Sequence, residues 1–389
     1  MEQPSIRGKP KVGEAKSEFR VETRASLQSV GREAFEKLVG DDLPPFLSFD
    51  WLDALEHTGC VEPERGWLPL HLLLLRGEDL VAMAPAYIKG NSEGEFVFDH
   101  QWAHFSEARL GVAYYPKLIV AVPFTPATGP RLIIGKGYAP QVIVDIMQEG
   151  IQEICQRMGL SGAHVLFPDE EEANQWERAG ALHRIGVQFH WRNRGYASFD
   201  DFLRQALPSK RRTQIRRERR ALVEQGVRLS TLTGTALSPE LADIAYELYL
   251  STVDKFVWGR QYLNRAFFRE VFRRLPERIQ LVLARDRDGQ VLAGAFNLIG
   301  RRTLYGRYWG AFSELPFLHF NVCYYHGVEY CIEHGLELFE PGAGGEHKRV
   351  RGFEPTLTHS VHILSDPRLT RVIADFLQRE REILATMAG

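Results

Sequence analysis

The order of predicted elements recurs in the two halves of the chain, and this repeat constrains the fold more than any other feature. Each half contains helices, antiparallel strands, a loop, a long helix and a buried strand. The long helices are predicted over Pro140–Met158 and Phe320–Glu333, and the strands that follow end in Leu166-Phe167-Pro168 and Phe339-Glu340-Pro341. A period close to half of the 389 residues predicts a tandem repeat of one α/β unit.

The remaining elements follow from hydrophobic periodicity and turn residues. Further helices are predicted over Ser26–Leu38, Asp50–Thr58, Glu170–Arg178, Ser238–Thr252, Asn264–Arg274 and Asp366–Met387. Strands are predicted over Leu70–Leu75, Leu80–Ile88, Lys117–Val122, Ala163–Phe167, Leu182–Trp191, Ile279–Arg285, Val291–Ile299, Thr303–Trp309 and Leu336–Glu340. We expect a flexible arm over 1–24, one α/β domain over 25–195 and a second over 196–389. The sequence leaves open which half the C-terminal helix 366–387 packs against.

The cysteines and the apolar runs indicate where such a chain resides. Cys60, Cys155, Cys323 and Cys331 form no CxxC pair and no cluster with zinc spacing, so we predict buried thiols and no metal site. The longest apolar run, Leu68–Leu75, is too short to span a bilayer, and the N-terminus has no signal-peptide core. These features predict a cytoplasmic protein without a transmembrane segment.

A glycine-rich segment, Pro341–Phe353, directly follows a predicted buried strand. In α/β sheets, ligands tend to bind beyond the carboxyl ends of strands. Its glycines allow positive φ and close backbone approach, and its polar residues include possible proton acceptors and cations for phosphate or carboxylate. The glycines are Gly342, Gly344 and Gly345; the polar side chains are Glu346, His347, Lys348, Arg349 and Arg351. The alternative is a flexible turn followed by a solvated charged loop.

Two further segments carry candidate binding residues. In the first half, acidic and aromatic side chains surround a predicted loop and could hold an amine; they are Glu95, Asp99, Trp102, Tyr114 and Lys117. An ordinary edge strand and turn explains this segment about equally well. In the second half, the strand containing His359 and His362 adds candidates, and strand alternation places Ser360 and His362 on one face.

Arginine concentrates in a third segment, Ser209–Arg220, which has seven basic residues and one glutamate. The chain has 38 Arg and only 10 Lys, and Arg suits planar oxyanions. On a helix, Arg212, Arg216 and Arg219 share a face. Their positive charges repel one another unless acidic groups or phosphates neutralise them. A solvated charged face is the alternative. The net charge of −2 excludes a uniformly basic surface but permits a local basic patch.

Several catalytic motifs are absent from the sequence. It has no Walker A loop, no GxGxxG after a strand, no HExxH and no GxSxG. Kinases, Rossmann dehydrogenases, zincins and serine hydrolases with these motifs are therefore disfavoured.

The motifs together resemble the FemAB-like N-acyltransferases of bacteria. The resemblance rests on Glu340–Lys348 with Arg351–Pro355 and His359-Ser360, on Ser92–Asp99, on Tyr114–Lys117 with Val122–Pro126, and on the basic helix from Lys210 to Arg217. It covers residues 42–385 and implies two tandem GNAT-type α/β domains. It also implies a relation to the FemABX proteins, which transfer amino acids from aminoacyl-tRNA to peptidoglycan precursors.

One departure bears on the donor. GNAT domains that use acyl-CoA carry a pyrophosphate loop of the form Arg/Gln-x-x-Gly-x-Gly/Ala before the long helix. This sequence has Ile134–Gly137 and Ser313–Phe317 at those places. The resemblance thus favours aminoacyl-tRNA over acyl-CoA as the cosubstrate, with no permanently bound cofactor.

The resulting hypothesis is an N-acyltransferase acting on a small-molecule or peptide amine. We expect catalysis by Glu346, His347 and Lys348. Donor binding is assigned to Arg351, Gly342, Gly344, Gly345, Lys210, Arg212 and Arg216. Acceptor binding is assigned to Glu95, Asp99, Trp102, Tyr114, Lys117, His359 and His362. Two alternatives stay open: an acyl-CoA-dependent GNAT enzyme, and a non-catalytic module of the same fold that binds RNA or glycan.

Overall fold

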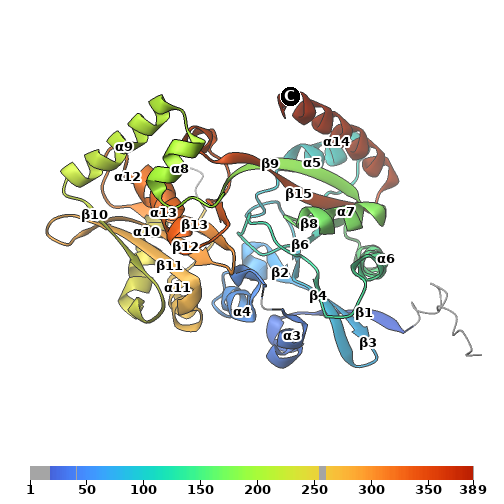
Figure 1. The fold of residues 1–389 in the computed structure, drawn as a ribbon. Helices are drawn as coiled ribbons and strands as arrows, with labels where there is room; N and C mark the ends of the chain where they lie inside the picture. Colours follow the sequence, from blue (N-terminus) through green and yellow to red (C-terminus); the bar gives the residue numbers. More distant parts are fainter. Residues whose placement is uncertain (1–17, 41, 254–259, 389) are drawn as a thin grey trace, which may run out of the picture.

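The computed structural model describes residues 18–40, 42–253 and 260–388. A large, mostly antiparallel sheet runs through both halves of the molecule in the order β10-β11-β12-β13-β14-β9-β15-β8-β6-β5-β2 (Figure 1). Its strands are β10 (Arg228–Leu232), β11 (Ile279–Arg285), β12 (Val291–Ile299), β13 (Thr303–Ala311), β14 (Leu338–Glu340), β9 (Leu182–Arg192), β15 (Glu354–Leu364), β8 (Gly162–Leu166), β6 (Lys117–Val120), β5 (Ala86–Lys89) and β2 (Trp67–Pro69). A second sheet contains β1 (Phe19–Arg24), β3 (His71–Arg76), β4 (Asp79–Ala84) and β7 (Ile133–Ile134).

The two halves exchange strands at the centre of the large sheet. Strand β9, from the first half of the chain, pairs with β14 of the second half, whereas β15, from the second half, pairs with β8 of the first. Between them, β9 and β15 pair with each other from Glu354↔His190 to His362↔Leu182. The halves are therefore joined by a continuous hydrogen-bonded ladder.

Helices cover both faces of the sheets. They are α2 (Leu27–Val30), α3 (Arg32–Leu38), α4 (Phe49–His57), α5 (His100–Phe105), α6 (Pro140–Met158), α7 (Glu170–Arg178), α8 (Phe199–Ala206), α9 (Ser209–Glu224), α10 (Pro239–Val253), α11 (Arg265–Arg274), α12 (Leu318–Phe320), α13 (His326–Glu333) and α14 (Pro367–Ala388). Short turns are η1 (Pro45–Leu47), η2 (Pro63–Arg65), η3 (Ser106–Leu110), η4 (Gly234–Ala236), η5 (Pro276–Arg278), η6 (Asn321–Tyr325) and η7 (Glu346–Arg351).

The predicted repeat is present in the connections. In the first half, α6 links the parallel strands β6 and β8; in the second, the helical run 318–333 links the parallel strands β13 and β14. Both connections are the β–helix–β crossover that parallel neighbours require. The predicted fold class, α/β with two tandem GNAT-like units of mostly antiparallel sheet, is confirmed. The boundary between 195 and 196 stays a prediction.

Most predicted elements lie within one to three residues of their observed bounds, and the larger differences have local causes. The helix predicted over Ser26–Leu38 is divided at Gly31, whose φ of +86° interrupts the helical backbone. The strand predicted over Leu80–Ile88 is divided at Pro85 into β4 and β5, which belong to different sheets. Proline has no N–H to donate to a ladder, so a strand readily ends there.

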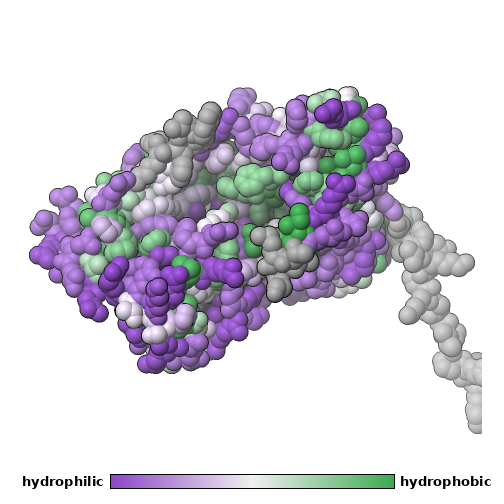
Figure 2. All heavy atoms as spheres, turned by 90° about the horizontal axis from the view of Figure 1, so that it is seen from above, coloured by the Kyte–Doolittle hydropathy of each residue, from purple (hydrophilic) through white to green (hydrophobic). Residues whose placement is uncertain are grey.

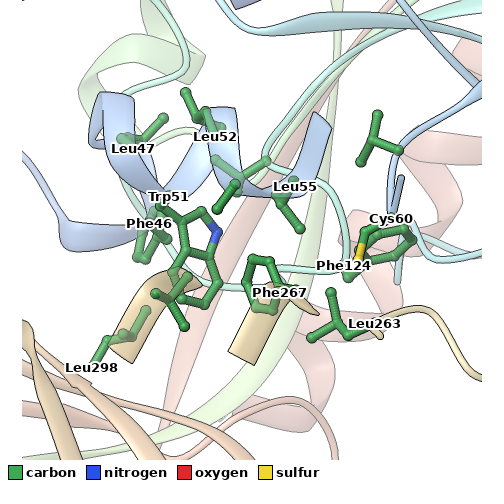
Figure 3. Close-up of a cluster of buried hydrophobic side chains, with 14 of the residues drawn as sticks. Phe46, Leu47, Trp51, Leu52, Leu55, Cys60, Phe124, Leu263, Phe267 and Leu298 are labelled. Carbon is green, nitrogen blue, oxygen red and sulfur yellow. The ribbon is translucent and has the colours of Figure 1, made fainter. Parts of the chain in front are cut away.

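A shared apolar core joins the two halves below the sheet. Helix α4 of the first half packs on α11 of the second, and the rings of Trp51 and Phe267 meet edge to face at 5.0 Å (Figure 3). Phe46, Leu298 and other buried side chains from both halves belong to the same cluster. Because burial of apolar surface stabilises at about 25 cal/mol per Å², this shared core stabilises the contact between the halves.

The C-terminal helix packs against elements of the first half. Leu369, Ile373 and Leu377 of α14 form one buried cluster with Trp102 and Tyr114. In the described ranges, no helix has both the length and the apolar character needed to cross a membrane. The four cysteines are free thiols; Cys60, Cys155 and Cys331 are buried and Cys323 is partly buried.

Candidate active site

A cleft of about 920 Å³ opens where β13 and β14 separate. The two strands pair in parallel at only three positions, of which the last is Tyr305↔Glu340. Just beyond it, Gly306 lies so close to Pro341 that an added Cβ would come within 3.0 Å of the proline Cα. From there β13 continues to Ala311, while the segment that follows β14 turns away from it. The two diverging segments form walls of the cleft.

The walls combine aromatic and cationic side chains of the second half of the chain with Phe96 of the first. The lining residues are Phe96, Tyr249, Thr252, Val253, Arg260, Tyr262, Ala295, Asn297, Gly306, Arg307, Tyr308, Trp309, His319, Cys323, Tyr324, Pro341, Gly342, Ala343, Gly344, Gly345, His347 and Lys348. A concave, largely apolar site with a few converging polar groups is the usual form of a small-molecule or cofactor site. Five of the predicted residues, namely Gly342, Gly344, Gly345, His347 and Lys348, are brought together here.

Lys348 is the most unusual of these side chains. It is 2% exposed, and its Nζ donates to the carbonyl oxygen of Gly342 at 2.6 Å. Within the described part of the chain, no carboxylate oxygen lies within the 4.0 Å of a salt bridge to Lys348. Burial lowers the pKa of Lys348 to about 8. An ammonium group held without a counter-charge at the wall of a cleft is a favourable place for an anion.

Arg307 provides a second cation on the opposite wall. Its Nη2 donates to the carbonyl oxygen of Phe124 and to Thr125 Oγ1, while its buried Nε has no partner among the described residues. In those same residues no carboxylate forms a salt bridge with Arg307. Guanidinium N–H groups that are left free near a cavity suit a phosphate or carboxylate oxygen.

His347 and Glu346, the other predicted catalytic residues, occupy different environments. His347 lines the cleft, and its Nε2 lies 2.9 Å from the hydroxyl of Tyr324. Burial, with the charges of Arg351 and Lys348, lowers the pKa of His347, so the neutral ring can accept a proton at pH 7. Both residues are exposed, but Glu346 lies outside the lining of the cleft. The geometry therefore favours His347 over Glu346 as the proton acceptor.

Arg351, predicted to bind the donor, is buried among protein groups and does not line the cleft. It is 6% exposed, its Nε donates to Tyr325 Oη at 2.9 Å, and its Nη1 donates to the carbonyl oxygen of His347 at 2.9 Å. Its guanidinium lies 3.5 Å from the ring centre of Phe320 and forms an ion pair with the buried Glu218 at 3.5 Å. Glu218 is the one acidic residue of the basic segment, so this pair fixes η7 to α9.

The basic helix α9 lies away from the cleft. Arg216 forms an ion pair with Asp200 at 2.9 Å, and Arg212 donates to the carbonyl oxygens of Arg204 and Leu207 at the end of α8. Arg219 is paired with Glu329. Most of the arginine face predicted to meet donor phosphates is thus neutralised by neighbouring helices. Lys210 is exposed. The lining of the cleft includes none of the residues Lys210, Arg212 and Arg216.

The residues predicted to bind the acceptor form a closed ion cluster instead of a pocket. Lys117 is fully buried, and its Nζ donates to Ser92 Oγ at 2.7 Å, Glu95 Oε2 at 2.9 Å and Asp99 Oδ2 at 2.5 Å. The hydroxyl of Tyr114 donates to the same Asp99 oxygen at 2.8 Å. The four predicted members are therefore closed to solvent in this structure, and contact with an acceptor would require the cluster to rearrange.

The pKa values of the two carboxyl groups of this cluster shift in opposite directions. Burial raises the pKa of Glu95 to about 7 against the opposing charge of Lys117. Burial acts in the same direction on Asp99, but the Lys117 ammonium outweighs it and lowers the pKa of Asp99 to about 2. Asp99 is therefore the permanent counter-charge of Lys117.

The other predicted acceptor residues lie near a second, smaller cavity. Ser360 and His362 share one face of β15 as predicted, and their Oγ and Nε2 atoms are 3.0 Å apart. His359 lies on the other face, and its Nδ1 is 2.9 Å from Nε2 of His183. Trp102 is buried with its ring against His362 at 4.7 Å between centres. None of these lines the main cleft.

Several lining residues were not predicted from the sequence, above all Arg307, Tyr308 and Trp309 on β13. These three large side chains are consecutive and only partly buried in β13. The decisive observation, that β13 pairs with β14 and then diverges, depends on tertiary pairing.

Gly345 offers a test of the turn geometry. Its φ is +89°, and an added Cβ would meet His347 Cε1 at 2.9 Å. We expect Gly345→Ala to cost about 1–2 kcal/mol of unfolding free energy in urea titrations and to reduce acyl transfer by displacing His347. Gly137→Ala is the matched control, because Gly137 has φ of +90° with nothing within 4 Å of the added Cβ. It should show the same loss of stability and retain activity; equal activity in both variants would contradict a role for this turn.

Comparison with known proteins agrees with this architecture. Residues 26–388 match the FemAB-like family, described as peptidoglycan biosynthesis/recognition. The crystal structure of FemX has a TM-score of 0.51 with 13% identity, covering 91% of this chain and 100% of that one. L-PGS from Bacillus licheniformis has a TM-score of 0.47 with 9% identity over 76% of this chain and 86% of that one. A tandem GNAT protein from the clavulanic acid biosynthesis pathway has a TM-score of 0.45 with 12% identity over 90% of this chain and 99% of that one.

A search of the curated proteins finds no match. At identities this low, similarity to the solved structures supports the fold alone. The family match, in contrast, spans nearly the whole chain. The chain therefore belongs to the FemAB-like family, and this membership supports an acyltransferase acting in peptidoglycan biosynthesis.

Proposed function

We propose that the chain transfers an aminoacyl group from aminoacyl-tRNA to an amine of a peptidoglycan-precursor peptide, and that the cleft between β13 and β14 holds the reacting groups. The observation that carries this proposal is Lys348, a buried ammonium without a carboxylate partner in the described residues, at the wall of the cleft. An activated acyl donor presents anionic oxygen at its reacting end, both in its phosphates and in the tetrahedral intermediate.

In this proposal the acceptor amine attacks the ester carbonyl of the donor. His347 takes the proton of the attacking amine, because its neutral ring lies in the lining and is oriented by Tyr324. The positive charge of Lys348 stabilises the oxyanion or the adjoining phosphate, and the tRNA hydroxyl leaves with a proton. Catalysis is then mainly positioning and electrostatic stabilisation.

The segment before the helical run 318–333 supports aminoacyl-tRNA over acyl-CoA. A pyrophosphate loop needs successive backbone N–H groups, and this segment contains Pro316, which has none, and the acidic Glu314. Phe317, at its end, has φ of +67° without being glycine. Acyl-CoA bound through the turn 342–345 is the competing donor.

Transfer assays with both donors test the proposal. Radiolabelled aminoacyl-tRNA and acyl-CoA are each incubated with the protein and a peptidoglycan-precursor peptide that carries a free amine, and mass spectrometry locates the product. Transfer of label from tRNA to the amine supports the proposal. Transfer from acyl-CoA alone would show that acyl-CoA, and not aminoacyl-tRNA, is the donor. Absence of transfer from both, with RNA bound in a salt-sensitive manner, would favour the non-catalytic module.

The lowered pKa of Lys348 predicts how donor binding depends on pH. Below about pH 8 the ammonium is present, and above it the neutral amine cannot attract an anion. A bound anion stabilises the ammonium and raises the pKa of Lys348, so binding takes up a proton at pH 8.5. We expect affinity for an RNA hairpin carrying the tRNA acceptor end to fall as pH rises from 7 to 9. Calorimetry in buffers of different ionisation enthalpy measures the proton, and the uptake should vanish in Lys348→Met.

A further inference from the structure

A second cavity of about 480 Å³ adjoins the main cleft and shares Phe96, Ala343 and Gly344 with it. It lies between β9, β15 and α14, and its walls include Phe98, Phe167, Val187 and Ile383. Figure 2 shows this face of the molecule, where apolar side chains gather in the hollow between the two halves. Phe98 is 74% exposed and Ile383 59% exposed, so the rim of the cavity is apolar as well.

Ser360 in the lining of this cavity begins a chain of hydrogen-bonded side chains that leads into the core. Its Oγ lies 3.0 Å from His362 Nε2, and His362 Nδ1 lies 2.7 Å from Nδ1 of His164. The register causes this alignment, because His362 stands directly opposite His164 in the β15–β8 ladder and two residues from Ser360. All three side chains are at least 96% buried.

The hydrogen-bond chain determines the tautomers. If Ser360 donates to His362 Nε2, His362 carries its proton on Nδ1 and donates it to His164 Nδ1. The proton of His164 is then on Nε2, a buried atom without a partner among the described residues. Asp99 Oδ1 is another such buried atom, and the negative charge of Asp99 acts on His164. A serine and two imidazoles are therefore linked by hydrogen bonds, so that His362 can take the proton of the Ser360 hydroxyl, while Asp99 acts on His164 through its charge and not through a hydrogen bond.

We propose that Ser360 is a nucleophile that accepts an acyl group from esters or thioesters with an apolar acyl chain. Ser360 Oγ forms a bond to the acyl carbon as His362 Nε2 takes its proton. The bond from that carbon to the leaving oxygen or sulfur breaks, and His362 returns the proton to the leaving group. Water then hydrolyses the acyl-serine, releasing the carboxylic acid and restoring the hydroxyl. The apolar walls hold the chain, which places this activity apart from the aminoacyl transfer proposed for the main cleft.

Reaction with ester probes tests this proposal on the full chain. The protein is treated with a fluorophosphonate and, separately, with p-nitrophenyl acetate, butyrate and hexanoate, and peptide mass spectrometry locates the adduct. We expect an adduct on Ser360 that forms faster as the acyl chain lengthens. His362→Gln should slow its formation by at least about 100-fold, since the general base is lost.

The controls separate a nucleophile from a merely reactive surface. Ser365→Ala removes a nearby serine whose Oγ donates to the Leu160 carbonyl and should label like the wild type. Ser360→Ala should lose the adduct. Absence of an adduct on Ser360 in the wild-type protein would overturn the proposal, whatever the stability of the variants. Aminoacyl transfer measured in the same preparation keeps the two activities distinguishable.

Discussion

Replacing Lys348 with methionine is expected to reduce kcat/KM for acyl transfer by at least about 100-fold while the protein remains folded. Methionine keeps the apolar length of the side chain but removes the ammonium that faces the cleft. Preorganised charge next to a developing oxyanion commonly contributes a factor of about 10²–10³. Stability should change little, because a buried cation without a carboxylate partner in the described residues carries a desolvation cost that its loss removes.

Steady-state kinetics and thermal melts of matched variants check this result. Lys37→Met is the control, since Lys37 is exposed and, among the described residues, forms an ion pair with Glu33 of its own helix alone. Lys348→Arg retains the charge in a larger planar group and should recover part of the activity if charge is what matters. Full activity in Lys348→Met would remove Lys348 from the proposed site. A parallel collapse of the melting temperature would show a structural role instead.

Replacing Lys117 with methionine is expected to destabilise the protein by about 3–5 kcal/mol, which is a large part of the stability of a typical domain. The variant would leave Asp99 and Glu95 buried without their counter-charge, and Ser92 would lose its partner. The pKa of both carboxyl groups would rise, so the deficit should shrink as pH falls and protons neutralise them. Urea unfolding at pH 7.5 and pH 5 measures both effects.

A triple variant separates charge from packing in this cluster. Lys117→Met combined with Glu95→Gln and Asp99→Asn removes all three charges and should be less destabilised than the single variant, because no uncompensated ion remains. If Lys117→Met alone lost less than about 1 kcal/mol, the cluster would be open to water, and its original assignment to acceptor binding would regain support.

Local features of the sequence account for the elements and for the glycine turn. Helix α6 and strands β11 and β12 have the predicted bounds, because apolar periodicity, a proline start and an Asp-Gly turn are signals that neighbours seldom override. The turn at 342–345 adopts positive φ at each of its three glycines, as their residue type predicts. It lines the cleft together with Lys348 and His347.

The charged residues were harder to assign, because charge alone does not indicate its partner. Arg351 and Lys348 are three residues apart, yet one is bound by Glu218 of a distant helix and the other faces the cleft. Glu95, Asp99 and Lys117 were expected to hold an acceptor amine around a loop. They lie buried, where their mutual pairing offsets their desolvation.

By itself, the sequence determined the α/β repeat, the place of the glycine turn and the family, since each depends on residues close together in the chain. Only the tertiary structure decided which charges are neutralised, that β9 and β15 are exchanged between the halves, and that β13 diverges from β14 to form a cleft. The physical reason is that strand pairing and burial are set by partners far away in the chain, such as His164 and His362, which are 198 residues apart. Periodicity shows which face of a strand is buried but not which strand lies beside it.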